Sequence, residues 1–186
     1  MKLTCGLLLA AVTATCYGSI DFTPTTAERV LDGIKFQQLI FHENGRKISY
    51  EQPRAWRYAA SASQIVFTPP NITQAEGVID QSRLEKPENF DEATMKSLQD
   101  QVLASVANAE RVTLVSAEKN PLLINRHETF EVTIAYQIGG VEFERSVLFL
   151  NLPDTQLRFR VTANKRDFEK VHQAFRGSIF SWQWSS

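Results

Sequence analysis

Cysteine is scarce in this sequence and is confined to its beginning. The 186 residues include two cysteines, Cys5 and Cys16. The chain after them therefore has no disulfide, no thiolate nucleophile and no cysteine metal ligand. The three histidines are far apart and lack the His-x-x-x-His spacing of a zinc site. We predict a protein that needs no metal or other cofactor.

Sequence signals of several common activities are also missing. There is no Gly-x-Gly-x-x-Gly or Walker loop to hold a phosphate, and no Gly-x-Ser-x-Gly elbow of a serine hydrolase. The formal net charge is −1, so no general basic field favours nucleic acid. No apolar run reaches the about 20 residues that cross a bilayer. We predict a protein that is not an enzyme, binds no nucleic acid and has no transmembrane segment.

The first residues have the order of a cleavable secretory signal peptide. One charge precedes the apolar run 3–12, and small and polar residues follow it. We expect cleavage after Gly18, with Ala14 as the alternative, so that residues 1–18 are removed and residues 19–186 form one exported domain. That length is sufficient to bury a core without disulfides. The predicted location is the bacterial periplasm or the extracellular space.

A lipidated N-terminus at Cys16 is the alternative to a leader that is discarded whole. A lipobox has Leu about three residues before its cysteine and Gly or Ala directly before it, whereas this chain has Thr13 and Thr15 there. The sequence therefore favours an ordinary leader cysteine over a lipoprotein.

Turn signals between alternating apolar residues predict two β-hairpins. Asn44 and Gly45 form a two-residue turn that sets Phe41 opposite Ile48. Reflection about a second turn, at Gly139 and Gly140, aligns two long strands with a nearly unbroken apolar face. The facing sets are Phe130, Val132, Ile134, Tyr136 and Ile138 against Phe149, Val147, Arg145, Phe143 and Val141.

Helical spacing predicts three helices. A capping box begins a short amphipathic helix over residues 25–33. A second helix runs from its cap at Asn89 to about Asn108, and a third begins near Asn164 and ends at Gly177. With a further strand returning from the second hairpin, this order predicts an α+β fold with helices packed on one antiparallel sheet.

Two stretches of the chain carry a resemblance to a known family. Residues 48–56, ISYEQPRAW, form a strand that runs into a Pro-x-x-Trp turn, and residues 157–182 read as a strand, a Phe-bearing helix and a Ser-Trp ending. These features resemble the PsbP-like domains and the related bacterial DcrB-like envelope proteins, over most of residues 34–182. The resemblance implies an α/β/α sandwich on a mostly antiparallel sheet. Because its motifs are structural and its understood members look like binding or assembly factors, it implies no catalytic residue.

Arg145 is the candidate anion-binding or pocket residue. The hairpin register sets it on the apolar face opposite Ile134, where a buried guanidinium needs a partner. It either binds an anion or carboxylate between sheet and helix, or pairs with an acidic helix residue or reaches the sheet margin. No converging groups define a pocket around it, so the sequence favours the structural role.

A basic surface with an aromatic tail is the candidate interaction site. Basic residues outnumber acidic ones over residues 157–178 and would attract an acidic partner or an anionic membrane surface, with a solvated helix face as the alternative. The tail aromatics either dock a partner or close the core, and the family ending favours the core. The candidate surface comprises Arg158, Arg160, Lys165, Arg166, Trp182 and Trp184.

These features predict an exported, non-catalytic envelope protein that serves as a protein-binding or assembly module. Its expected partner is another envelope protein, with peripheral membrane contact as a further option, and its oligomeric state is open. The alternative is a small-ligand or lipid carrier with an apolar cavity between sheet and helix and Arg145 at its mouth. A hydrolase would instead need Ser, His and Asp or Glu within hydrogen-bond reach in a cleft.

Overall fold

Strands dominate the described part of the chain, which comprises residues 19–43 and 45–185 of a computed structural model. The predicted signal peptide and Cys16 lie outside these residues. The larger sheet has the order β4-β5-β6-β10-β9-β8-β7, and its neighbours pair antiparallel. Its strands are β4 (Arg57–Ala60), β5 (Gln64–Thr68), β6 (Glu76–Arg83), β7 (Glu110–Lys119), β8 (Thr129–Ile138), β9 (Val141–Asn151) and β10 (Thr155–Asn164).

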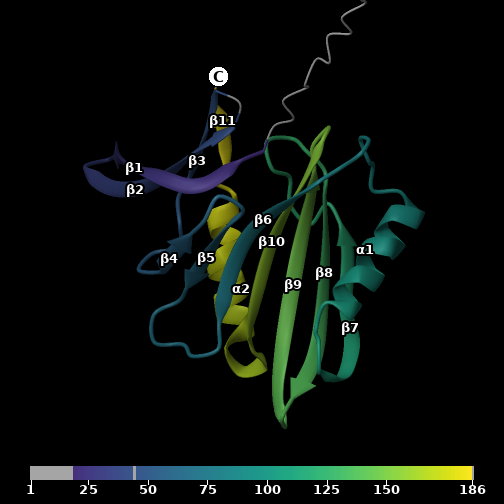
Figure 1. The fold of residues 1–186 in the computed structure, drawn as a ribbon. Helices are drawn as coiled ribbons and strands as arrows, with labels where there is room; N and C mark the ends of the chain where they lie inside the picture. The colour runs from purple at the N-terminus through teal and green to yellow at the C-terminus, as the bar shows by residue number, and fades with distance from the viewer. Residues whose placement is uncertain (1–18, 44, 186) are drawn as a thin grey trace, which may run out of the picture.

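A smaller, four-stranded sheet joins the two ends of the described chain. Its order is β1-β2-β3-β11, so the C-terminal strand lies beside β3 rather than in the larger sheet (Figure 1). The sequence predicts one sheet, and this second sheet is a correction to it. The strands are β1 (Asp21–Leu31), β2 (Ile34–Glu43), β3 (Arg46–Tyr50) and β11 (Gln183–Ser185).

Two helices cover opposite faces of the seven-stranded sheet. α1 (Glu92–Ala104) lies over β8 and β9 on one face, and α2 (Lys165–Ile179) lies over β9 and β10 on the other (Figure 1). The four-stranded sheet lies on the same side as α2 and shares its core. This is the α+β sandwich, with helices on a mostly antiparallel sheet, that the sequence predicts.

Both predicted hairpin registers are confirmed. Gly139 and Gly140 have φ of +55° and +82°, the left-handed conformations that a tight two-residue turn requires. All five predicted facing pairs of β8 and β9 are present, including Ile134 opposite Arg145. In the smaller sheet, Phe41 lies opposite Ile48.

The predicted first helix is wrong, because residues 25–31 belong to β1. Asp32 and Gly33 have φ of +50° and +77° and form a two-residue turn that returns the chain along β2. The Asp-Gly pair is a hairpin signal of the same kind as Asn-Gly, and the β-branched residues before it favour a strand. The sequence interpretation took Gly33 for a helix stop instead.

The ends of the other two helices also differ from the prediction. Asp91, not Asn89, caps α1, since its carboxylate accepts a hydrogen bond from the Thr94 amide at 2.8 Å. α1 ends at Ala104, before the predicted Asn108. α2 continues through Gly177 to Ile179. Propensity locates helices more reliably than it locates their last turns.

Each face of the seven-stranded sheet has its own hydrophobic core. On the α1 side the core is small and consists of residues from α1, β8 and β9 together with Phe90. On the α2 side it is larger, because α2 and the four-stranded sheet both contribute to it. Trp56, from the Pro-x-x-Trp turn, stacks on Phe175 of α2 at 6.2 Å between ring centroids, so this family motif has a packing role here.

Candidate functional site

The predicted basic surface is divided between the two faces of the sheet. Arg158 and Arg160 of β10 lie opposite Phe149 and Val147 of β9, on the face that α1 covers. α2, which carries Lys165 and the residues after it, packs on the other face. Strand alternation directs the two arginines away from α2, and for this reason the six candidates do not form one surface.

Lys165 and Arg166 lie at the first turn of α2. The Nζ of Lys165 lies 3.3 Å from a carboxylate oxygen of Glu142, and Arg166 pairs with Asp167 at 3.1 Å. Both side chains are mostly exposed, and they line a broad depression of about 550 Å³ beside Val141. Exposed pairs of this kind contribute little to stability and leave the helix start as an ordinary solvated face.

Trp182 is a core residue and is not part of a surface, which corrects the predicted interaction site. It is 1% exposed and lies 5.7 Å from Phe41 and 5.4 Å from Phe159, measured between ring centroids. Trp184 is half-buried at the edge of the smaller sheet, where it pairs with Ile48. The tail therefore closes the core, as the family ending indicates, while Phe180 remains 64% exposed.

Arg145 connects the sheet to the end of α1. Its Nε donates to the hydroxyl of Thr162 at 3.1 Å, and a terminal nitrogen donates to the carbonyl and hydroxyl of Ser105 at 3.3 and 3.1 Å. Its guanidinium also lies 5.7 Å from the ring centroid of Tyr136. Burial lowers the pKa of Arg145, and the neighbouring Tyr136 opposes that shift. Arg145 thus neutralises the C-terminal end of a helix, a structural role, although its partners are Thr162 and Ser105 and not the acidic helix residue that the sequence analysis considered.

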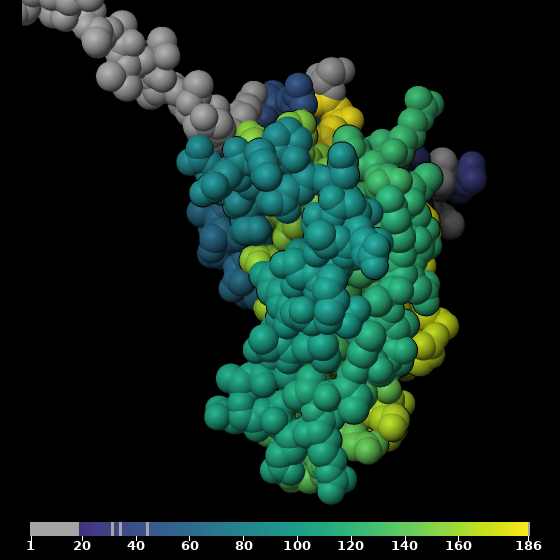
Figure 2. Space-filling view, turned by 90° about the vertical axis from the view of Figure 1, so that its right-hand side faces the viewer, coloured from purple at the N-terminus to yellow at the C-terminus, as the bar shows by residue number. Residues whose placement is uncertain are grey.

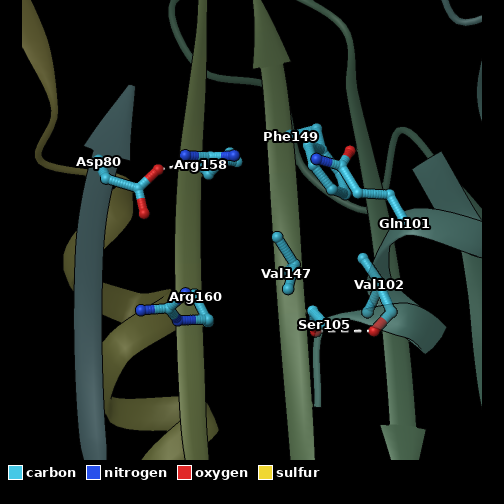
Figure 3. Close-up of a pocket in the computed structure, with 8 residues that line it drawn as sticks. All are labelled: Asp80, Gln101, Val102, Ser105, Val147, Phe149, Arg158 and Arg160. Carbon is cyan, nitrogen blue, oxygen red and sulfur yellow. Dashed lines mark hydrogen bonds and ion pairs between the residues drawn. The ribbon is translucent and has the colours of Figure 1, made fainter. Parts of the chain in front are cut away.

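Arg158 and Arg160 line a small cavity between the sheet and α1, which we call the arginine cleft. Figure 3 shows the two side chains on β10 beside Asp80 of β6, with β9 and the end of α1 opposite them. The cleft has a volume of about 100 Å³. In Figure 2, part of β10 remains visible beside α1, which does not cover the whole face. The cleft is lined by Asp80, Gln101, Val102, Ser105, Val147, Phe149, Arg158 and Arg160.

The two arginines of the cleft differ in their partners. Arg158 forms an ion pair with Asp80, the residue directly across the β6–β10 ladder. Arg160 lies across from Val78 instead, and its Nε is buried without a hydrogen-bond partner. Within the described residues Arg160 takes part in no ion pair. A buried donor without a partner is costly, so this atom distinguishes Arg160 from its neighbours.

A buried polar cluster under α2 was not recognised in the sequence. Glu131 of β8 accepts hydrogen bonds from Ser146 at 2.7 Å and from His172 Nε2 at 2.8 Å, and its other oxygen lies 3.5 Å from Arg176. Polar residues alternate with apolar ones along β8 and β9, a pattern typical of a sheet with one solvent-facing side, but α2 covers this side. The signal for a covered side was the pair His172 and Arg176, one helical turn apart on the helix that follows.

The Glu131 cluster does not have the geometry of a hydrolytic triad. Ser146 and His172 both bond to the same oxygen of Glu131, so the carboxylate lies between them and His172 does not contact the Ser146 hydroxyl. Ser146 is 1% exposed, which leaves no room for a substrate. In the described part of the chain no group of His, Cys, Asp and Glu residues is arranged to hold a metal ion.

Fold and site together define an α+β protein with an arginine cleft beside one helix of the larger sheet. No protein-family profile matches the sequence. No curated protein matches it either. Within the described residues, no helix is long and apolar enough to cross a membrane.

Solved structures resemble the fold at low sequence identity. LpqN of Mycobacterium tuberculosis, a protein involved in cell envelope biogenesis, superposes with a TM-score of 0.52 and 15% identity over 89% of this chain and 92% of that one. PsbP of Synechocystis sp. PCC 6803 gives a TM-score of 0.48 and 13% identity over 95% and 99%. Protein PA94 of Pseudomonas aeruginosa, of unknown function, gives a TM-score of 0.48 and 14% identity over 83% of this chain and 94% of that one. The predicted α+β fold is confirmed by the arrangement of its elements, and these likenesses concern the fold alone.

Proposed function

We propose that this chain is an exported, non-catalytic module that binds another protein of the cell envelope. The observation that carries the proposal is the arginine cleft, where a cation without a partner lies beside apolar side chains at the border of α1. Cationic and apolar groups next to each other are typical of the small pockets in which an interface anchors a partner side chain.

The size of the arginine cleft supports protein binding over the transport of a ligand. Pockets that enclose a lipid or a drug-sized molecule have volumes of roughly 300–1,000 Å³. The arginine cleft has about 100 Å³. It admits a protruding group and leaves the rest of the bound molecule outside, as a protein partner would be.

The packing of the remaining polar groups supports a non-catalytic role. The Ser, His and Glu side chains that converge under α2 bond to one another in a closed interior and have no cleft beside them. Arg145 is held by Thr162 and the end of α1. These groups are committed to structure, whereas Arg160 in the arginine cleft is not.

The location of the partner follows from the predicted leader. Residues 1–18 have the order of an export signal, so the domain would meet its partner outside the cytoplasm. LpqN, which has the same fold, is described as involved in cell envelope biogenesis. Both observations agree with an envelope partner.

Affinity capture from an envelope extract tests the proposal with a matched pair of charge reversals. Arg160→Glu changes the arginine cleft, and Arg166→Glu makes the same change of charge on the solvated start of α2. We expect the wild-type domain and Arg166→Glu to retain one common protein and Arg160→Glu to lose it. Circular dichroism and thermal unfolding would establish that both variants are folded.

Two results would contradict the proposal. One is that the wild-type domain retains no specific protein from the extract. The other is that the two reversals reduce capture equally, since the binding would then follow the overall charge of the domain and not the arginine cleft.

A further inference from the structure

The charges around the arginine cleft leave one positive charge unbalanced. Three arginines lie along this face on β9 and β10, and two carboxylates lie on β6, at Asp80 and Glu76. Asp80 forms an ion pair with Arg158, and Arg145 is held by hydrogen bonds to Thr162 and Ser105. Glu76 lies across the ladder from Thr162 and forms no ion pair among the described residues, so three guanidiniums face two carboxylates and Arg160 is the one without a partner there. Its buried, unpaired Nε is the one charged group among the described buried polar atoms without a partner.

One surplus charge favours an anion with a single negative charge. A phosphoryl group carries about −1.5 to −2 at neutral pH and would leave the cleft negative. A carboxylate carries one charge and presents two oxygens, which match the Nε and a terminal nitrogen of a guanidinium as a pair of parallel hydrogen bonds. Arg160 offers that Nε without a competing acceptor.

The apolar walls and the volume of the arginine cleft limit the size of the group that carries the carboxylate. Val102, Val147 and Phe149 provide an apolar wall beside the arginines. A dry cavity of about 150 Å³ holds a benzene molecule, and this one, at about 100 Å³, is smaller. It therefore holds a carboxylate with a stem of one or two methylene groups. A free acid of that size has too few atoms to bind tightly, so the group belongs to a larger molecule.

We propose that the arginine cleft is the pocket for one acidic side chain, Glu or Asp, of the partner protein. This inference rests on the proposed binding function and names the anchor group of the partner. In the complex, Arg160 donates from Nε and a terminal nitrogen to the carboxylate, and the methylene stem lies against Val147 and Phe149. Arg158 keeps its ion pair with Asp80 and borders the site.

Short carboxylates serve as probes for the pocket in the isolated domain. Acetate and propionate are titrated into ¹⁵N-labelled domain while NMR follows the Nε–Hε resonance of each arginine, with propionamide and phosphate in parallel. We expect propionate to shift the Arg160 resonance saturably in the millimolar range, propionamide not to shift it, and phosphate to bind more weakly than propionate. Arg160→Gln should weaken propionate binding by roughly tenfold or more, the loss expected for a charged hydrogen bond.

Arg166→Gln is the control, because it removes one exposed guanidinium and leaves the arginine cleft unchanged. Its propionate affinity should equal that of the wild type. The inference is overturned if propionate leaves the Arg160 resonance unshifted, if phosphate binds more tightly than propionate, or if both glutamine variants bind propionate equally well.

The capture experiment and the titration fail in different ways. If Arg160→Glu abolishes capture but propionate does not bind, the protein-binding function stands and the carboxylate pocket is rejected. If propionate binds at Arg160 but no envelope protein is captured, the pocket stands and the protein-binding function is rejected. A peptide of the captured partner, with its Glu or Asp residues changed singly to Gln or Asn, would then identify the anchor.

Discussion

The two faces of the seven-stranded sheet differ in how their polar side chains are paired. On the α2 face, Glu131 is buried and receives hydrogen bonds from Ser146 and His172, and the smaller sheet closes the rest of the core. On the α1 face, the helix covers β8 and β9, and a row of charged residues borders it on β10 and β6. Among the described residues both sides contain a buried donor without a partner, the indole Nε1 of Trp182 in the closed core and the Nε of Arg160 on the α1 face, but only the second belongs to a charged group.

We infer from this difference that the polar groups of the α2 face serve stability and that Arg160 on the α1 face serves binding. Polar groups that only maintain a fold are expected to satisfy one another, as those around Glu131 do. A buried donor left without a partner opposes folding, and such local inconsistencies concentrate at functional sites. The α2 face is therefore expected to be sensitive to stability mutations, whereas a change at Arg160 in the arginine cleft is expected to affect binding alone.

Trp182→Ala should have the largest effect, because it removes the side chain that joins the two sheets on the closed face. Trp182 is 1% exposed and contacts Phe41, Tyr50 and Phe159. We expect a loss of about 3–5 kcal/mol in the free energy of unfolding, measured by urea denaturation. Phe180→Ala is the control: that ring is 64% exposed, and its removal should change stability by less than about 0.5 kcal/mol. If Trp182→Ala and Phe180→Ala lowered the free energy of unfolding by similar amounts, the C-terminal tail would not be part of the core.

Glu131→Gln should lower the free energy of unfolding by about 1.5–3 kcal/mol, the range for hydrogen bonds to a charged group. The carboxylate is 7% exposed, and the change weakens its bonds with Ser146, His172 and Arg176. Thermal and urea unfolding at neutral pH would measure the loss. Thr113→Val, which removes a long hydrogen bond on an exposed edge strand, should be nearly neutral by comparison. An equally stable Glu131→Gln variant would show that the cluster does not stabilise the closed face.

The same residue predicts a pH dependence of stability. Burial acts to raise the pKa of Glu131, but hydrogen bonds from His172 and Ser146 outweigh it and hold the pKa below its usual value. The folded state therefore prefers the ionised form, and this stabilisation is present above the unfolded pKa of about 4.3 and is lost as the pH falls through the folded pKa. Between about pH 5 and pH 3, wild type should lose more stability than Glu131→Gln. Parallel pH profiles of the two proteins would refute this assignment.

Gly77→Ala should have an intermediate effect on the closed face. A Cβ at Gly77 would lie 2.7 Å from ring carbons of Phe175, which α2 holds against the sheet. Overpacking of this kind costs about 1–3 kcal/mol. Gly177→Ala is a control of opposite sign, because nothing lies within 4 Å of its added Cβ and the residue is inside α2, where Ala is favoured by about 0.5–1 kcal/mol. If Gly177→Ala destabilises instead, α2 ends where the sequence alone indicated.

The sequence predicted the pairing of neighbouring strands in the larger sheet better than it predicted which helix covers each face of that sheet. The β8–β9 register follows from one turn and the period of two residues along a strand, so Arg145 opposite Ile134 could be derived without a structure. Which helix covers which face depends on contacts between distant segments, and no local pattern encodes it. For that reason Arg158 and Lys165 were assigned to one surface although they lie on opposite sides of the sheet.

Local sequence patterns also predict only part of the arginine cleft. β10 alternates basic and apolar residues, which predicts that Arg158 and Arg160 share a face. Asp80 neutralises Arg158, whereas Val78 leaves Arg160 unpaired, and both facts depend on how β6 pairs with β10. Arg158 and Asp80 are 78 positions apart in the sequence. Long-range pairing of this kind lies beyond single-sequence patterns.

The smallest effect is expected on the α1 face, from Arg160→Met. The methionine keeps the apolar stem and removes a cation whose Nε has no partner, so the free energy of unfolding should change by less than about 1 kcal/mol or rise slightly. Arg145→Met, on the neighbouring strand β9, should instead lower the free energy of unfolding by about 1–3 kcal/mol, because it breaks hydrogen bonds to Thr162 and to the end of α1. Urea denaturation of both variants decides the comparison: if Arg160→Met costs as much as Arg145→Met, Arg160 is as structural as its neighbour and the two faces of the sheet do not differ in the way that a binding site requires.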